Sequence, residues 1–471
     1  MDSLILLVDF GSTFTKVIAA NLEKEVVLGR SQSPTTVQDN LLSGLQNALA
    51  SLSIEGLKLT ESDLKKCRKL ACSSAAGGLR LITIGLVPEL TLEAAKRAAL
   101  GAGAKVVGSF SHELTGDDIS RIEQIGCDII LLSGGTDGGN KKVILHNSRM
   151  LAESKLDVPF IIAGNRVAVD RAREILETHN KYAEITENVL PELDRINVEP
   201  ARGRIRDIFM KRIVHARGLD RAQEFIGDII MPTPLATLKA AQLLADGIGR
   251  EPGFGELIVV EVGGATTNVH SVSKGDRSGR TVKGLPEPYA KRTVEGDLGI
   301  RYNAATIVEM LGLEKVGMNF PETVDCSKWD ILKAARRRSQ NVGFVPSDEQ
   351  DFLIDMCLAK SAVEVAVERH AGIIKEMCSP YGVEEVQYGK DLTGIKTIIG
   401  TGGVFAYNRY PGMILEAALF NRKNPLSLKP LSPVFYTDQR YIIYGIGLLS
   451  ESEPAKALRI ARKYLHKFDG L

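Results

Sequence analysis

The stretch Asp9-Phe-Gly-Ser-Thr-Phe-Thr-Lys16 decides the fold, and it directly follows the apolar run Leu4-Ile-Leu-Leu-Val8. An unbroken apolar run of this kind is typical of a strand that is buried on both faces. The turn offers what a phosphate group needs: accessible backbone N–H groups at Gly11, hydroxyl groups at Ser12, Thr13 and Thr15, and the positive charge of Lys16. Asp9 could hold the water shell of a magnesium ion. A plain β-hairpin with a polar turn is the competing interpretation of this stretch alone.

A second stretch repeats the same order of residue types. The apolar run Leu257-Ile-Val-Val260 leads into Glu261-Val-Gly-Gly-Ala-Thr-Thr267. An acid, a pair of glycines and two hydroxyl groups again follow a strand. Two such hairpins that face one another would hold a polyphosphate from both sides, so the repetition favours a nucleotide site over two unrelated polar turns.

Two further apolar runs also end in glycines. Asp128–Ser133 precedes Gly134-Gly-Thr-Asp-Gly-Gly-Asn140, and Ile395–Ile399 precedes Gly400-Thr-Gly-Gly-Val404. The last stretch has neither an acid nor a lysine, so we expect a flat ring or a ribose to lie against its backbone. Each half of the chain thus opens with a Gly/Thr turn and reaches a glycine pair a similar distance later. This indicates a weak internal duplication of a whole domain.

Composition limits the function classes. The chain has 471 residues, 44% hydrophobic and 25% charged, with a formal net charge of +1. This length predicts two or three domains, and the charge balance gives no support for a general affinity for nucleic acid or an anionic membrane. Six scattered cysteines, without a CxxC pair or a signal peptide, favour a reducing cytoplasm. The P-loop and Rossmann signatures are absent from the sequence.

Three of these motifs occur in the order Asp9–Lys16, Glu261–Thr267 and Gly400–Val404. In this order they resemble the motifs of the superfamily of sugar kinases, actin and heat-shock-chaperone ATPases. That resemblance implies an α/β fold of two duplicated, actin-like (ribonuclease H-like) ATPase domains with a nucleotide cleft between them, plus helical insertions. Five runs of the sequence are distinctive: Cys72–Arg80, Leu132–Asn140, Met231–Pro234, Val262–Thr267 and Arg292–Gly299. Together they resemble the MutL family that accompanies glutamate mutase, which is unrelated to the mismatch-repair protein of that name.

The resemblance implies an ATP-dependent reactivating chaperone for an adenosylcobalamin-dependent mutase, which exchanges damaged for intact cobalamin. Glutamate mutase is the first choice of client, and lysine and ornithine aminomutases stay open. Two other classes also stay open: a small-molecule kinase of the same superfamily, and a filament-forming protein of the actin kind. The implied partners are the mutase subunits and ATP or ADP, and a homo-oligomer is possible. Cobalamin itself would belong to the client enzyme.

The resemblance also assigns site residues. Asp9 and Glu261 would organise magnesium, and Lys16 would neutralise phosphate charge. Asp137 is a candidate for orienting the attacking water, and an Asp-Gly turn after a strand is the competing interpretation of that residue. The expected nucleotide contacts are Gly11, Ser12, Thr13, Thr15, Gly263, Gly264, Ala265, Thr266, Thr267, Gly400, Gly402, Gly403 and Val404. The family pattern has Asp where this chain has Glu261 and Asn268, so we expect magnesium-ATP binding to survive and hydrolysis to be slow.

The expected domain boundaries follow from the same reasoning. Residues 1–170 would form the first actin-like half, 171–230 a helical connection, 231–450 the second half with a helical insertion at about 305–390, and 451–471 a C-terminal helix. Helices are predicted after the capping box at Thr115–Asp118, from Glu89 to Leu100 and from Pro234 to Leu244. The run Arg336–Arg338 is expected to be a solvated helix face, and His270 to be a packed histidine rather than a ligand.

Overall fold

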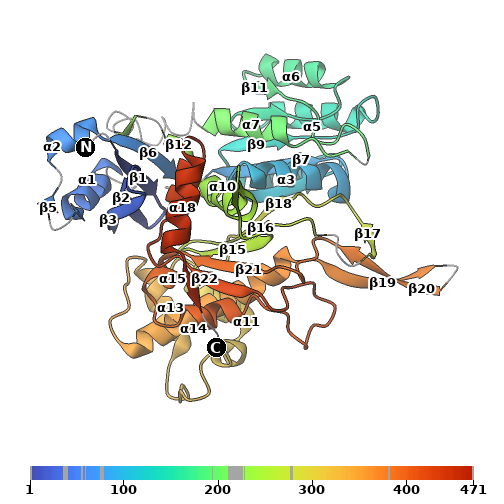
Figure 1. Cartoon of the computed structure of the whole chain (residues 1–471). Helices are drawn as coiled ribbons and strands as arrows, with labels where there is room; N and C mark the ends of the chain where they lie inside the picture. The colour runs from blue at the N-terminus through green and yellow to red at the C-terminus, as the bar shows by residue number, and fades with distance from the viewer. Residues whose placement is uncertain are drawn as a thin grey trace. The chain divides into compact units, whose positions relative to one another are not determined.

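A computed structural model of the chain describes residues 3–35, 41–54, 57–58, 60–74, 79–193, 195–209, 226–227, 229–275, 279–379 and 382–468. Packing divides the chain into two compact units. The first consists of Met1–Ala76, Arg221–Lys283 and Glu287–Leu471, and the second of Gly77–Asp220 and Gly284–Pro286. In Figure 1 the second unit is the cyan-to-green part that carries the labels α5, α6 and β11.

The first unit contains two sheets built on one plan. The first sheet is formed by β1 (Leu4–Phe10), β2 (Phe14–Asn21), β3 (Val26–Pro34), β6 (Arg68–Ser73) and β12 (Ile229–Pro232). The second is formed by β15 (Leu257–Val262), β16 (Thr267–Val272), β18 (Ala290–Glu295), β21 (Thr397–Thr401), β22 (Val434–Thr437) and β23 (His466–Phe468). The strand orders are β3-β2-β1-β6-β12 and β18-β16-β15-β21-β22, with β23 added at the edge.

Strand directions match as well. In each sheet the first three strands along the chain form antiparallel pairs. The next two strands run parallel to the first strand along the chain, which is β1 in one sheet and β15 in the other. The same order with the same directions in two sheets is the duplication expected for an actin-like ATPase, so the predicted fold class is confirmed. The runs that begin at Leu4 and Leu257 are indeed strands that are almost completely buried.

One part of the predicted repeat is wrong. The counterpart of β21 in the first sheet is β6, since each lies parallel beside the first strand of its sheet. The glycines from Gly134 to Gly139 instead follow β9 (Ile129–Leu132), which belongs to the second unit. The prediction matched these two glycine stretches because each follows the first strand of its half at a similar distance along the chain. In the structure, the first of those distances includes part of the unit that is inserted between β6 and β12.

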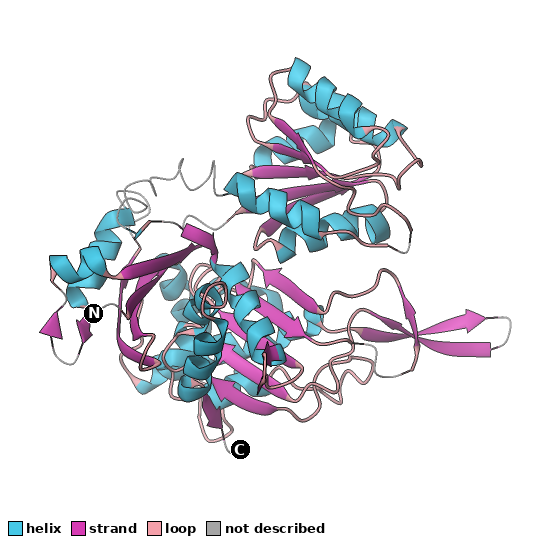
Figure 2. Cartoon of the chain, turned by 45° about the horizontal axis from the view of Figure 1, so that its top comes forward, coloured by secondary structure: helices cyan, strands magenta, loops and turns pink. Residues whose placement is uncertain are grey.

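The second unit has its own parallel sheet. Its strands are β7 (Arg80–Gly85), β8 (Lys105–Ser111), β9, β10 (Phe160–Ile162) and β11 (Ala183–Ile185), in the order β8-β7-β9-β10-β11. All four pairings are parallel. Helices cover both faces of this sheet (Figure 2). The order 2-1-3-4-5 is that of a doubly wound, flavodoxin-like sheet, whose ligands bind at the carboxyl ends of the strands.

The structure therefore divides the chain differently from the boundaries predicted at 170, 230 and 450. Residues 1–76 pack with the C-terminal half, because β12 completes the first sheet after the inserted unit. The segment 171–230 contains β11 and the start of β12 as well as helices, and its residues 210–225 lie outside the described part. Within 305–390 the helices end at His370, and the projecting hairpin β19 (Ile373–Ser379) and β20 (Gly382–Tyr388) follows (Figures 1 and 2).

Helices of the first unit are α1 (Leu41–Ser51), α2 (Glu61–Lys66), α10 (Thr233–Asp246), α11 (Ala304–Leu311), α12 (Leu313–Gly317), α13 (Ile331–Gln340), α14 (Glu349–His370), α15 (Gly403–Tyr407), α16 (Pro411–Glu416), α17 (Ile443–Leu449) and α18 (Pro454–Tyr464). Those of the second are a π-helix (Pro88–Leu92), α3 (Glu93–Gly101), α4 (Gly116–Ile125), α5 (Lys142–Ala152), α6 (Val169–Thr178) and α7 (Glu199–Ile208). The capping box at Thr115 is confirmed, with Asp118 at N3. The predicted C-terminal helix is α18, which ends at Tyr464.

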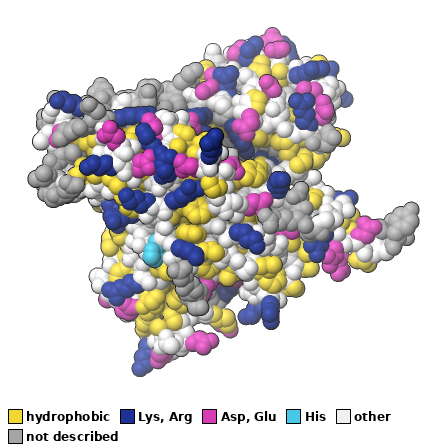
Figure 3. Space-filling view, viewed as in Figure 1, with side chains coloured by type: hydrophobic (Ala, Val, Ile, Leu, Met, Phe, Trp, Pro, Cys, Tyr) yellow, Lys and Arg dark blue, Asp and Glu magenta, His cyan; other side chains and the backbone are white. Residues whose placement is uncertain are grey.

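Three short strand pairings complete the list: β4 (Ser53–Ile54) with β5 (Leu57–Lys58), β13 (Gly247–Ile248) with β14 (Glu251–Pro252), and β17 (Thr281–Lys283) with β20. No helix among the described residues is long and apolar enough to cross a bilayer. On the face shown in Figure 3, basic and acidic side chains are interspersed rather than gathered by sign.

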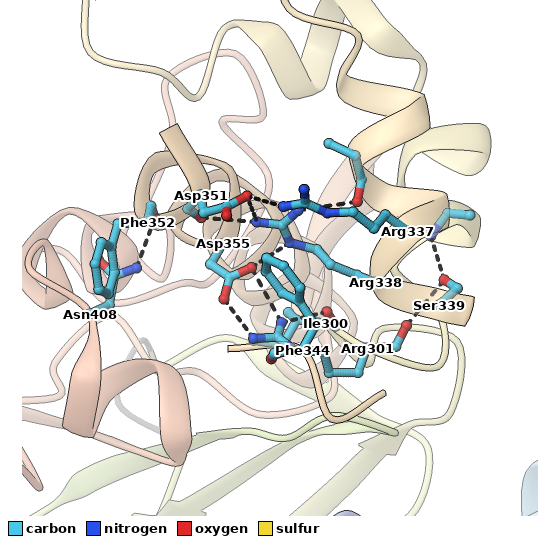
Figure 4. A network of polar contacts seen from close by, with 12 residues as sticks. Ile300, Arg301, Arg337, Arg338, Ser339, Phe344, Asp351, Phe352, Asp355 and Asn408 are labelled. Carbon is cyan, nitrogen blue, oxygen red and sulfur yellow. Dashed lines mark hydrogen bonds and ion pairs between the residues drawn. The ribbon is translucent and has the colours of Figure 1, made fainter. Parts of the chain in front are cut away.

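The predicted solvated face at Arg336–Arg338 is only partly correct. Arg338 is completely buried between α13 and α14, and its Nε donates to Asp355 Oδ1 at 2.6 Å (Figure 4). Arg301 Nη2 donates to the other oxygen of Asp355 at 2.7 Å, and the Arg338 guanidinium lies 4.6 Å from the ring of Phe344. Helical periodicity turns every third or fourth residue inward, and a run of three arginines hides which one that is.

Replacing Arg338 tests this network. Arg338→Ala leaves the Asp355 carboxylate buried with one guanidinium instead of two, so we expect the free energy of unfolding to fall by about 3–5 kcal/mol. Arg336, whose side chain is 58% exposed, is the matched control, and Arg336→Ala is expected to change it by less than about 1 kcal/mol. Denaturant unfolding followed by circular dichroism measures both. Equal losses in the two variants would contradict a structural role for Arg338.

Candidate functional site

The first hairpin carries an ion pair across its two strands. Asp9 and Lys16 are cross-strand partners in β1 and β2, and Lys16 Nζ donates to Asp9 Oδ2 at 2.6 Å. Gly11 N donates to Phe14 O and closes the turn between them. A Cβ on Gly11 would lie 2.5 Å from that oxygen and 2.9 Å from Lys16 Nζ, so only glycine fits this turn. The hairpin thus holds one carboxylate and one ammonium group next to its turn.

The second hairpin has the same register with different chemistry. Glu261 and Asn268 are cross-strand partners in β15 and β16, and Asn268 Nδ2 donates to Glu261 Oε2 at 3.0 Å. Gly263 N donates to Thr266 O, as Gly11 does to Phe14. Arg292 on β18 donates to Asn268 Oδ1 at 3.3 Å. A neutral amide therefore stands where the first hairpin has the ammonium group of Lys16.

The two turns lie next to each other within the first unit. A Cβ on Gly264 would lie 2.7 Å from Thr13 Oγ1, which brings the two predicted phosphate loops into contact. The segment after β18 fixes the second turn: Ile300 N donates to Gly263 O, and Arg301 N to Gly264 O. Asn303 Nδ2 adds a bond to Ala265 O at 2.9 Å. The glycine turn of the second hairpin is thus held rigidly from behind.

Helices α10 and α17 add two side chains to the first hairpin. Thr233 Oγ1, at the start of α10, donates to Asp9 Oδ1 at 2.6 Å. Tyr441, just before α17, places its ring 4.5 Å from Lys16 Nζ. Burial lowers the pKa of Lys16, but the charge of Asp9 outweighs it and the pKa is raised above its ordinary value. Burial raises the pKa of Tyr441 to about 12. The charges of Asp9 and Glu261 act in the same direction, and that of Lys16 acts in the opposite direction.

Glu261 lies among groups that keep it ionised. Burial raises its pKa, but His270 and the charges of Arg292 and Lys16 outweigh burial and lower it overall. His270 Nε2 is 3.6 Å from Glu261 Oε2, too far for a good hydrogen bond. Burial lowers the pKa of His270 despite the neighbouring carboxylate, so this histidine is neutral at pH 7. It is completely buried, in agreement with the expectation of a packed side chain.

The third motif ends β21 and begins α15. A Cβ on Gly402 (φ +113°) would lie 2.2 Å from Val262 O, and one on Gly400 would meet the Phe405 ring at 2.6 Å. Packing therefore explains these two glycines. Gly403 has open space where its Cβ would be, among the described residues. Of the three predicted glycines, Gly403 alone is free of a packing requirement among the described residues. Val404, the second residue of α15, is buried in the core.

Two predicted ligands have structural bonds instead. Thr267 is completely buried and its hydroxyl donates to Leu298 O at 2.7 Å. Thr15, equally buried, has its hydroxyl 3.2 Å from Thr35 Oγ1. Both hydroxyl groups therefore stabilise the turns from within instead of facing a bound phosphate. Asp137 belongs to the second compact unit, where its Oδ1 accepts from Arg166 N and Asn188 Nδ2. Its predicted role in orienting water stays a prediction.

Sequence reasoning missed several residues of this site. Thr233 and Tyr441 come from segments far from both glycine turns, and Asn303 supports the second turn from a loop. Asp438, completely buried, accepts from Ile442 N and Ile443 N and fixes the start of α17 beside Tyr441. Only Thr233 left a signal, since it lies in the distinctive run Met231–Pro234. The others have no pattern that distinguishes them in a single sequence.

The residues fit a magnesium nucleotide. Thr13 Oγ1 is a buried oxygen without a hydrogen-bond partner among the described residues, at the contact of the two turns, where a phosphate oxygen would satisfy it. In the described part of the chain no three His, Cys, Asp or Glu side chains converge on a metal position. Magnesium usually keeps several waters and takes one or two carboxylates with substrate phosphates. Asp9 and Glu261 are of the right kind for that.

Duplicated sheets with an acid and a glycine turn at the end of each first strand define an ATPase-type fold. Comparison with known proteins adds the family. The model of the MutL protein family matches residues 5–465. "Protein MutL" of Clostridium tetanomorphum is 47% identical over 469 residues, which cover 99% of this chain and all of that protein. The chain belongs to the MutL family.

Among solved structures the similarities are remote. Nucleotide-free acetone carboxylase is 13% identical, with 95% of this chain and 70% of that chain covered and a TM-score of 0.40. Gluconate kinase from Lactobacillus acidophilus is 10% identical, with 99% and 93% covered and a TM-score of 0.35. Glycerol dehydratase reactivase is 11% identical, with 96% and 100% covered and a TM-score of 0.33.

His270 makes stability depend on pH. Its pKa is lowered in the folded protein, so below about pH 6.5 the unfolded chain binds a proton that the folded chain excludes. The stabilisation is complete above that pH and is lost as the pH falls. We expect the free energy of unfolding to fall less steeply between pH 7.5 and 5.5 in His270→Gln than in the wild type. The exposed His466 serves as control, and an unchanged slope in His270→Gln alongside His466→Gln would refute the assignment.

Proposed function

We propose that the protein is an ATP-dependent reactivating chaperone for an adenosylcobalamin-dependent mutase, with glutamate mutase as the first client. The observation that carries the nucleotide part is the contact of two equivalent hairpins at Thr13 and Gly264, each with an acid at the end of a buried strand. Membership of the MutL family supports the reactivating part. Exchange of damaged for intact cobalamin would take place on the client.

In this proposal the second turn binds the polyphosphate through the backbone N–H of Gly264 and the first turn through the Thr13 hydroxyl, because Gly11 N already donates to Phe14 O. Lys16 exchanges its bond to Asp9 for a phosphate oxygen and neutralises its charge. Thr233 and Asn268 keep Asp9 and Glu261 oriented. Magnesium, when bound through these carboxylates, supplies charge neutralisation and positioning, which are most of what phosphoryl transfer requires.

Turnover is expected to be slow. Hydrolysis needs a group that positions the attacking water, and Glu261 is bonded to Asn268 rather than to a second acid. A slow ATPase suits a chaperone, because the ATP and ADP states then persist long enough to bias the client through different contacts. Client release in one state and client binding in the other would follow from closure of the turns around the γ-phosphate.

The test measures ATP loss and client recovery together. The purified chain with magnesium and ATP is added to glutamate mutase inactivated by hydroxocobalamin, and mutase activity is followed after adenosylcobalamin is supplied. We expect recovery to require ATP. Asp9→Asn, which keeps a side chain for the Thr233 bond but removes the charge, should slow ATP loss about 100-fold and abolish recovery.

Asp157→Asn is the control, because Asp157 is an exposed residue of the second unit and should leave both rates unchanged. Recovery of lysine or ornithine aminomutase in place of glutamate mutase would change the identity of the client and leave the proposed reactivating function unchanged. ATP loss without recovery of any of the three, and with a phosphorylated sugar or acid as product, would replace the proposal by a small-molecule kinase.

A further inference from the structure

A cavity of about 570 Å³ lies in the second unit, and the predicted nucleotide site does not account for it. It is formed at the carboxyl ends of β9, β10 and β11, where parallel α/β sheets bind their ligands. Val169, Ile185 and Pro191 form apolar walls. The volume is within the range of about 300–1,000 Å³ that is typical of small-molecule sites.

Two buried asparagines, Asn188 in the lining and Asn165 adjacent in the chain to other lining residues, hold the loops of this pocket. Asn165 accepts from Gly138 N and donates to Gly139 O, and it therefore holds the glycine loop after β9. Asn188 donates to Gly135 O at 3.0 Å and to Asp137 Oδ1 at 2.9 Å. Each amide joins the loop of one strand to the loop of another. The loops are thus held in place before any ligand arrives, which lowers the entropic cost of binding.

The charged groups of the lining are balanced. Asp137 and Glu187 are acidic, and Arg166 and Arg195 are basic. Each acid is fixed through one oxygen: Asp137 Oδ1 accepts from Asn188, and Glu187 Oε2 accepts from Asn197 at 2.8 Å. Arg166 Nε lies 4.0 Å from Asp137 Oδ2, and the Arg195 side chain has no ion pair with another described residue. Glu187 and Arg195 are therefore the two charges most available to a ligand.

We propose that this pocket binds an α-amino acid. Glu187 would accept from the ammonium group, Arg195 would bind the carboxylate through its fork of donors, and the side chain would lie against Val169 and Ile185. A single anion would leave the acids unpaired and a single cation would leave the arginines unpaired, whereas a zwitterion matches both. None of the lining residues is aromatic, so the pocket lacks the surface on which a nucleobase stacks. This site is independent of the proposed ATPase function.

Isothermal titration of the full chain tests the proposal with L-leucine, L-glutamate and L-lysine, each beside its N-acetyl derivative and its carboxamide. N-acetylation removes the ammonium group and amidation removes the carboxylate. We expect at least one free amino acid to bind with a Kd of about 1 mM or tighter. Either modification should weaken its binding by about fivefold to tenfold. Two substitutions then assign the contacts.

Glu187→Gln should weaken the binding of the free amino acid and remove the preference for it over its N-acetyl derivative. Arg195→Gln should remove the preference over the carboxamide. Glu192→Gln, at an exposed neighbouring position outside the lining, should change neither preference. ATP binding should persist in all three variants, and an unchanged circular dichroism spectrum and thermal unfolding curve would show that the second unit folds in each.

Three results would overturn the proposal. The first is that no free amino acid binds below about 10 mM. The second is that an N-acetyl derivative, or acetate alone, binds as tightly as the free amino acid, which would make this an anion site. The third is tighter binding of adenosine than of any amino acid. Loss of ATP binding by Asp9→Asn with amino-acid binding intact would separate this site from the nucleotide site.

Discussion

The close packing of α10 against α17 is the constraint on which the candidate site depends. A Cβ on Gly447 would lie 1.8 Å from Ala236 O, so the two helices approach more closely than any side chain larger than hydrogen allows. Both helices lie in a core cluster that also contains Leu7 of β1 and Val259 of β15. The same packing brings Thr233, at the start of α10, and Tyr441, ahead of α17, to the Asp9–Lys16 pair. The packing of these two helices therefore also determines the geometry of the site.

The two hairpins show how a duplicated framework can diverge in charge while its backbone stays the same. Register, turn closure and the position of the acid agree between them, but Lys16 in one is Asn268 in the other. An ammonium group neutralises Asp9 directly. Glu261 instead has an amide at 3.0 Å and the buried Arg292 behind it, so its charge is less fully compensated. The second hairpin is therefore the more negative of the two, which suits a cation shared with phosphate oxygens.

The sequence predicted what short-range chemistry determines. Apolar runs followed by glycine turns identified β1 and β15 and the residues at their ends, because buried strands and tight turns each impose a local pattern. It could not identify Thr233 or Tyr441, which reach the site through tertiary packing of helices. It also paired the wrong glycine stretches, since nothing in the residues around Gly134 reveals that they belong to an inserted unit with its own sheet. Arg338 was missed for the same reason: burial of one arginine among three depends on the partner helix.

The inserted unit separates β6 from β12 in the chain, and the residues at the carboxyl ends of these two strands contact the same carboxylate, that of Asp9. β6 and β12 are neighbouring strands, so an insertion between them needs little distance between its ends. Cys72, at the end of β6, has its Sγ 3.7 Å from Asp9 Oδ1, and Thr233, directly after β12, donates to that same oxygen. A displacement of either strand end therefore changes the contacts of Asp9.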